Sequence, residues 1–175
     1  MNVKLLFFLL FVSCFSGCKS QDLQTVPFVD LQKYAGKWYD ISHLPVSFMK
    51  GCECTTADYT LTEKGYIEVI NTCRKGIPGK WKTARGKAFV VPGSNNSRLK
   101  VQFFWPFKGD YRIIELADDY SYAVVGDKTR KYLWILSRTS QMDPGLYNEI
   151  TGRTANKGFA VEKLEFSKQN GCEKD

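Results

Sequence analysis

The fold is decided by YRIIELADDYSYAVVGDKTRKYLWILS, residues 111–137. Three short apolar runs lie in this stretch, Tyr111–Ala117, Tyr122–Gly126 and Tyr132–Ser137, and they are rich in aromatic and β-branched residues. Such runs, separated here by the turn-forming pairs Asp118-Asp119 and Asp127-Lys128, are typical of strands joined by tight turns. The stretch therefore predicts three consecutive antiparallel strands.

The same pattern extends toward the N-terminus, with turn signals such as Glu63-Lys64-Gly65 and Lys108-Gly109-Asp110 between apolar runs. A chain of 175 residues has room for one domain. Because an open sheet exposes unpaired backbone groups at its edges, we expect the strands to close into a barrel. The sequence thus predicts an all-β fold, an eight-stranded antiparallel up-and-down barrel, whose other five strands are residues 37–43, 54–62, 66–73, 81–91 and 97–105.

One helix is expected after the last strand. Asp143 followed by Pro144 is typical of a helix N-cap and first helical position, and Gly158 marks the end. Its apolar residues predict that this C-terminal α-helix packs on the outside of the barrel. The tail Phe159–Phe166 alternates in polarity and is expected to add a short edge strand.

Residues 1–17 are expected to be a secretory signal peptide, because Lys4 precedes an apolar stretch too short to span a membrane. The segment Phe15-Ser16-Gly17-Cys18 resembles the lipobox of bacterial lipoproteins, which implies cleavage before Cys18 and its acylation with diacylglycerol and palmitate. Residues 18–29 would then form a lipidated linker, and residues 30–175 the folded domain. Ordinary cleavage and secretion is the alternative.

The net charge of +7 comes from Lys and Arg spread along the chain. No block of like charges marks a nucleic-acid-binding tail, so we expect no nucleic-acid partner. Solubility is the simplest role of the excess charge, and attraction to anionic lipid surfaces is the alternative.

Two disulfides are expected, because an even number of cysteines remains after acylation of the N-terminal one in an exported chain. Spacing leaves the pairing open, since both Cys52 and Cys54 are candidates to bond Cys73. A metal site is not expected, because His43 is the only histidine and the two neighbouring cysteines are too close for the usual zinc spacing. The four remaining cysteines are Cys52, Cys54, Cys73 and Cys172.

Gly36-Lys37-Trp38, Asp119-Tyr120 and the tract ending in Arg138 together resemble the signature of the lipocalin family. In that family the arginine that ends the last strand packs over the tryptophan of the first strand and closes one end of the barrel. The resemblance therefore implies structural roles for Gly36, Trp38, Asp119, Tyr120 and Arg138, with Arg138 stacked on the Trp38 indole.

The tracts Leu99–Phe107, Gly109–Tyr111 and Tyr132–Arg138 are most similar to bacterial outer-membrane lipoprotein lipocalins, and also to apolipoprotein D and plant temperature-induced lipocalins. These relatives imply a fatty acid or lysophospholipid as ligand. The bacterial relatives imply a lipid anchor at Cys18 in the outer membrane. Apolipoprotein D implies a disulfide from Cys54 to the C-terminal Cys172, which leaves Cys52 with Cys73.

Residues of a barrel strand alternate between the lumen and the outside, so one set from each strand faces the ligand. The loop Leu44–Lys50 resembles a lipocalin lid, from which Phe48 is expected to reach the ligand. An error of one residue would exchange the two faces of a strand, and a solid aromatic core is the alternative to a cup. The inward candidates are Val101, Phe103 and Trp105; Tyr111 and Ile113; Tyr122 and Val124; and Tyr132, Trp134 and Leu136.

The expected function is binding and transport of a small hydrophobic molecule, without a cofactor, as a monomer or weak homodimer. A lipocalin-fold enzyme is the rival from another class. A single histidine and few acids near the expected pocket leave no obvious catalytic set. A pigment- or haem-binding lipocalin is a third interpretation.

Overall fold

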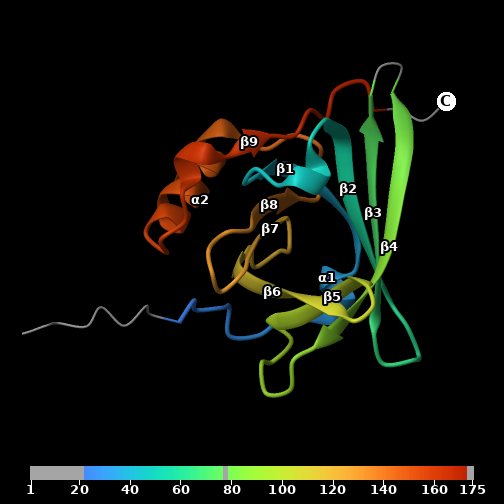
Figure 1. The fold of residues 1–175 in the computed structure, drawn as a ribbon. Helices are drawn as coiled ribbons and strands as arrows, with labels where there is room; N and C mark the ends of the chain where they lie inside the picture. The colour runs from blue at the N-terminus through green and yellow to red at the C-terminus, as the bar shows by residue number, and fades with distance from the viewer. Residues whose placement is uncertain (1–21, 77–78, 173–175) are drawn as a thin grey trace, which may run out of the picture.

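The computed structural model describes residues 22–76 and 79–172 and shows a closed antiparallel barrel (Figure 1). Each strand pairs with the next along the chain, and β8 and β2 both pair with β1, which closes the sheet. The predicted eight-stranded up-and-down barrel is therefore confirmed. Its strands are β1 (Gly36–His43), β2 (Cys52–Leu61), β3 (Ile67–Lys75), β4 (Lys80–Val90), β5 (Arg98–Phe104), β6 (Phe107–Leu116), β7 (Tyr122–Gly126) and β8 (Leu133–Ser137).

Closure depends on how β1 divides its pairing between neighbours. Its first residues pair with β2, Gly36 opposite Tyr59, whereas its last residues, Ser42 and His43, pair with a two-residue strand, β9 (Glu165–Phe166). The C-terminal segment that follows β9 fills the space between the diverging strands. There the Cys54 amide donates to the Lys168 carbonyl at 2.7 Å. The expected tail strand is thus present, but only over two residues, and Val161–Lys163 form a 3-10 turn (η2) instead.

The turn between β5 and β6 differs from the expected one. It lies at Trp105-Pro106, where Phe104 pairs with Phe107, and not at Lys108-Gly109-Asp110, which belongs to β6. Pro106 suits a turn because proline has no backbone N–H to donate to a ladder. Asp110, read from the sequence as a turn former, instead accepts charged hydrogen bonds on the sheet, as described below.

Helix α2 (Pro144–Ala155) follows the predicted cap, since the Asp143 carboxylate accepts from the Leu146 amide at 2.9 Å. It lies outside the barrel, on the side opposite β2–β4 (Figure 1). Ile150 of α2 is fully buried against Val124 and Ile135, which confirms the predicted outer packing. Among the described residues, no helix has the length and apolar character needed to cross a bilayer.

The segment before the barrel packs on its wall. Leu23 is buried, and the Val26 amide donates to the Ile113 carbonyl of β6 at 3.0 Å. The chain then forms the short helix α1 (Leu31–Tyr34), capped by Asp30, whose side chain accepts from two amides of the first turn. Part of the segment expected to be a linker is therefore attached to the barrel. Residues 1–17 and Cys18 lie outside the described residues.

Candidate functional site

The lower half of the barrel is packed solid. Trp38 of β1, Ile113 of β6 and Leu136 of β8 face inward and are at most 5% exposed. The core that they share also includes Tyr34 from α1, which lies under the strands. Close packing of this kind leaves no room for a ligand at this end. The core is completed by Val29, Tyr59, Ile67, Val69, Ala88, Leu99, Ala123 and Val125.

Arg138 closes this end as the family signature implies. Its guanidinium carbon lies 3.8 Å from the centre of the Trp38 ring, and its nitrogens donate to the carbonyls of Lys33 at 2.6 Å and Lys37 at 2.7 Å. Gly36 sits directly above with a φ of +90°, a conformation that side-chain-bearing residues rarely adopt. The arginine thus holds the turn from α1 into β1.

Asp119 and Tyr120 shape the neighbouring turn. The Asp119 side chain accepts from the Ser121 amide at 2.9 Å, and the Tyr120 hydroxyl accepts from the Asp30 amide at 2.8 Å. These two residues tie the β6–β7 turn to the cap of α1. Their place in the structure is at the closed end, as expected for signature residues.

Three tyrosines form a hydrogen-bonded group inside the packed half. The Tyr111 hydroxyl lies 2.7 Å from that of Tyr34 and 2.9 Å from that of Tyr59. Burial raises the pKa of Tyr59 to about 12, and burial likewise raises the pKa of Tyr34 and Tyr111 well above the ordinary value. The hydroxyls stay protonated and satisfy one another, so they form a polar floor beneath the open part of the barrel.

The upper half of the barrel is open to solvent. Trp38 pairs with Ala57 of β2, Ala57 with Asn71 of β3, and Asn71 with Ala84 of β4. Paired residues share a face of the sheet, so these three partners face inward as Trp38 does. Ala84 is nevertheless exposed, and Ala57 and Asn71 are only half-buried. The half-buried side chains of Val101 and Phe103, on the neighbouring strand β5, and of Trp134 on β8 also face inward and pack on the interior core. This apolar cup is the candidate ligand site.

A loop containing a 3-10 turn, η1 (Ser47–Met49), bounds the cup on the β1–β2 side. The Trp134 indole N–H donates to the Met49 sulfur at 3.3 Å, which ties this loop to β8. Phe48, expected to reach the ligand, is instead 64% exposed. In the described structure Met49, and not Phe48, is the lid residue in contact with the cup wall.

A buried polar cluster lies beside Trp134, where His43 pairs with it across the sheet. The His43 Nδ1 is 2.7 Å from a carboxylate oxygen of Asp40, and Ser167 donates to the same oxygen at 2.6 Å. Burial acts to lower the pKa of His43, but the hydrogen bond and charge of Asp40, with the charge of Glu165, raise it overall. The cluster joins β1 to the C-terminal segment.

Six of the predicted inward residues do face the interior: Val101, Phe103, Tyr111, Ile113, Trp134 and Leu136. The predicted orientation of Tyr122 and Val124 is wrong. Both pack under α2, where the Tyr122 hydroxyl donates to Glu115 at 3.0 Å, and Ala123 and Val125 face inward instead.

The reversal originates in a bulge of β6. Ile113 pairs with Val125 and Glu115 with Val124, so Ile114 is an extra residue that has no partner of its own. A bulge shifts the alternation by one residue. The pairing of β7 with β8 then places Val124 opposite Ile135 on the outer face.

Trp105 and Tyr132 are at the mouth and not on the cup wall. Trp105 occupies the β5–β6 turn and is 86% exposed, and Tyr132 precedes β8 and is 42% exposed. Tyr132 stacks on Trp134 with ring centres 6.1 Å apart. Of the two, Tyr132 contacts a predicted inward residue, Trp134, through this ring contact.

The two disulfides are Cys52–Cys73 and Cys54–Cys172. This is the pairing that the resemblance to apolipoprotein D implied. The first bond joins β2 to β3, and the second ties the C-terminal segment to β2. The open end is therefore crosslinked on the side where β1 and β2 diverge.

The sequence interpretation missed Tyr34, Tyr59, Asp40 and His43 as interior residues. Alternation along β2 from Ala57 to Tyr59 was the available signal for Tyr59. Alternation from Trp38 to Asp40 was likewise the signal for Asp40, but His43 could not be found this way, because the pairing of β1 with β8 shifts register between Asp40 and Ser42. A helix packed inside the barrel end gave no periodic signal for Tyr34.

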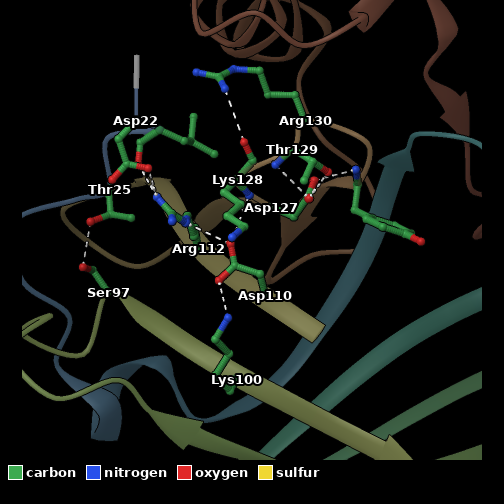
Figure 2. A network of polar contacts seen from close by, with 12 residues as sticks. Asp22, Thr25, Ser97, Lys100, Asp110, Arg112, Asp127, Lys128, Thr129 and Arg130 are labelled. Atoms are coloured by element: carbon green, nitrogen blue, oxygen red, sulfur yellow. Dashed lines mark hydrogen bonds and ion pairs between the residues drawn. The ribbon is translucent and has the colours of Figure 1, made fainter. Parts of the chain in front are cut away.

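A cavity of about 300 Å³ lies outside the barrel, between residues 22–27 and 93–98. Arg112 forms part of its wall, and Thr25 and Ser97 hydrogen-bond there at 2.8 Å (Figure 2). Its lining is mostly polar and it is open to solvent, unlike the aromatic cup. It is not suited to an apolar ligand.

Comparison with known proteins agrees with this geometry. The model of the lipocalin-like domain family matches residues 29–169. The chain is 36% identical to the outer membrane lipoprotein Blc of Vibrio cholerae over 170 residues, 95% of this chain and 99% of that protein. It is 32% identical to temperature-induced lipocalin-1 of Arabidopsis thaliana, over 87% of this chain and 86% of that protein. Among solved structures, insecticyanin of the tobacco hornworm Manduca sexta shares the fold, with a TM-score of 0.68, 19% identity and coverage of 83% and 84% of the two chains.

Proposed function

Because this chain belongs to the lipocalin-like family, we propose that it binds the acyl chain of a fatty acid or lysophospholipid in the upper half of its barrel. The observation that carries the proposal is the change of burial along the inner wall. Ile67, Val69 and Ala88, inward residues of the packed half, are buried, whereas Ala84, Val101 and Phe103 on the same inner face are solvent-accessible or half-buried. A hydrocarbon chain fits a cup that is mainly apolar, with Asn71 as a polar residue on its wall, open above and sealed below.

The energetics suit a long chain better than a short one. Each methylene removed from water contributes about 0.8 kcal/mol. A segment of about ten methylenes would contribute about 8 kcal/mol, against association costs that begin at about 4 kcal/mol. We expect the head group to remain at the mouth, because the tyrosine hydroxyls below already bond to one another.

We further propose that the protein acts at the outer membrane, anchored through acylated Cys18. Two observations support this location: the lipobox-like segment before Cys18, and similarity to proteins named outer membrane lipoprotein Blc in Vibrio cholerae and Escherichia coli. Mass spectrometry of the mature N-terminal peptide tests it directly. We expect a cysteine carrying acyl groups, and Cys18→Ser should move the protein out of the membrane fraction. An unmodified Cys18 in a secreted chain would contradict this part of the proposal.

The ligand proposal is tested by filling the cup. Ala84→Trp places a large ring in the lumen, so we expect the affinity for a fluorescent long-chain fatty acid to fall at least tenfold. Arg85→Trp is the matched control, since Arg85 is the next residue on β4 and has the opposite, outward orientation. Native mass spectrometry of lipids that copurify with the wild-type protein identifies the head group. Equal affinities for the two variants would refute binding in the lumen.

A further inference from the structure

The mouth of the barrel carries most of the exposed aromatic side chains. Because successive strands run in opposite directions, the mouth loops are residues 44–51, 105–106 and 127–132, beside the ends of β3 at Lys75 and of β4 at Lys80, and residues 62–66, 91–97 and 117–121 lie at the closed end. In the described part of the chain eight large hydrophobic side chains are exposed. Five are in or beside the mouth loops: Phe48 (64%), Phe104 (78%), Trp105 (86%), Phe107 (77%) and Tyr132 (42%).

The most exposed three form the tip of the β5–β6 hairpin. Phe104 pairs with Phe107, and Trp105-Pro106 is the turn between them. A hairpin tip of this kind presents its rings beyond the wall of the barrel. Exposed aromatic rings cost solubility unless a partner covers them, and aromatic residues favour the interface between water and hydrocarbon.

Lysines surround these rings at the same end. Six are exposed in or beside the mouth loops; Asp127 is the acidic residue within those loops, and Glu53 beside them pairs with Arg74 and Lys168. The Asp127 carboxylate is buried, and it accepts from the amides of Lys131 and Tyr132 at 2.9 Å. The closed-end loops differ, since they carry Glu63, Asp118 and Asp119. The six lysines are Lys50, Lys75, Lys80, Lys108, Lys128 and Lys131.

The described N-terminal segment begins against the middle of the β6 wall, at Arg112. Arg112 donates to Asp22 at 2.7 Å and to Asp110 at 2.9 Å, and Asp110 also accepts from the amide of Lys128 in a mouth loop at 3.0 Å (Figure 2). Two side chains, Arg112 and Asp110, therefore connect Asp22 to the mouth loop at Lys128. Cys18 is four residues before Asp22, a span of at most about 14 Å. A lipid on Cys18 would hold the barrel close to the bilayer, within reach of the mouth.

We infer that the mouth docks onto an anionic lipid bilayer, with Phe104, Trp105 and Phe107 in the interfacial layer and the surrounding lysines against the head groups. An anionic bilayer binds aromatic rings in its interfacial layer and cations at its surface, and the mouth carries both. The inference rests on the proposed function, because the acyl chain would then pass between bilayer and cup without crossing water. The occupant is a membrane, and not a second copy of the chain.

Tryptophan quenching tests the docking. The full-length protein is reconstituted with vesicles of phosphatidylethanolamine and phosphatidylglycerol whose acyl chains carry bromine, a contact quencher. We expect Trp105 to be quenched, so that Trp105→Phe removes at least half of the total quenching while keeping a ring at the tip. Quenching that remains in Trp105→Phe reports lipid near Trp81, at the mouth end of β4, or near Trp134 in the cup, and adding Trp81→Phe separates the two. An unquenched Trp105 overturns the inference.

Two sets of variants test the surface itself. Phe104→Ser with Phe107→Ser should reduce Trp105 quenching severalfold, whereas Phe28→Ser, at an exposed ring far from the mouth loops, should not change it. Lys128→Glu with Lys131→Glu should also reduce it, and Lys64→Glu at the closed end should not. Equal effects of the mouth variants and their controls would contradict docking through the mouth.

Measurements without vesicles separate the inference from the proposed function and from self-association. If the tip variants bind a fluorescent fatty acid as the wild type does but lose Trp105 quenching, docking is supported. If the wild type binds no fatty acid and Trp105 is still quenched by vesicles, the proposed function fails and docking stands. A concentration-dependent blue shift of Trp105 in vesicle-free solution would assign the tip to a second copy and overturn the inference.

Discussion

Arg138 is the residue on which the closed end depends, because one guanidinium both covers Trp38 and binds the carbonyls of the α1–β1 turn. Lysine would keep the charge but lose the planar fork that reaches several carbonyls. We therefore expect Arg138→Lys to lower the free energy of unfolding by about 2–4 kcal/mol, from lost charged hydrogen bonds and cation–π contact. Urea denaturation measures it.

Arg85→Lys is the control for this change. Arg85 lies on the outer face of β4 with its side chain 67% exposed, and it pairs with Glu68 at 3.6 Å. Exposed pairs of this kind contribute little. Equal losses for the two variants would show that Arg138 has no special role at the closed end.

His43 makes stability depend on pH. Its pKa is raised in the folded protein by Asp40 and Glu165, despite burial, so folding favours the protonated form. The stabilisation is complete below the unfolded-state pKa of about 6.5 and is lost as the pH rises through the folded-state value. We expect the stability difference between wild type and His43→Gln to shrink as the pH rises from about 5.5 to 9. If denaturant titrations gave the same stability difference between the two proteins across this pH range, they would contradict the stabilising His43–Asp40 contact.

Strand β7 shows at the level of elements where sequence reasoning succeeds and where it stops. Its bounds, Tyr122–Gly126, were predicted without error, because turn residues flank a compact apolar run. Its orientation was reversed, because the β6 bulge at Ile114 leaves no mark in the apolar pattern, and both faces of β7 are buried. Alternation identifies a face only where the other face is polar.

The β5–β6 hairpin illustrates the same limit. Glycine and aspartate at Gly109 and Asp110 favoured a turn, but Asp110 instead bonds Lys100 and Arg112 across the sheet. Arg112 lies two residues along the same strand, and Lys100 comes from β5 through a strand pairing that sequence alone does not give. The signature residues Trp38 and Arg138 were predicted correctly because the family resemblance carried their tertiary contact.

The two disulfides should contribute unequally. Cys54–Cys172 closes a loop of 118 residues and Cys52–Cys73 one of 21. By chain entropy the first would stabilise the fold by about 5 kcal/mol and the second by about 3 kcal/mol. Unfolding of the paired serine variants, Cys54→Ser with Cys172→Ser and Cys52→Ser with Cys73→Ser, measures the order. A larger loss for the shorter loop would contradict the view that the C-terminal segment completes the barrel.

The whole molecule divides along the barrel axis into a packed end and an open end. Trp38, Arg138 and the tyrosine group seal one end, while aromatic rings and lysines surround the other. The open end thus carries the proposed ligand entrance, the lid loop and the proposed membrane contact together. The packed end would keep its structure whether or not a ligand is bound.

The central claim is that an acyl chain occupies the upper lumen, and nuclear Overhauser contacts from a ¹³C-labelled long-chain fatty acid to methyl groups test it most directly. The structure predicts contacts from the chain to Ala84 and Val101, with none to Val124 or Leu146 under α2. Contacts to Val124 and Leu146, or saturating fatty acid without contacts to Ala84 and Val101, would contradict it.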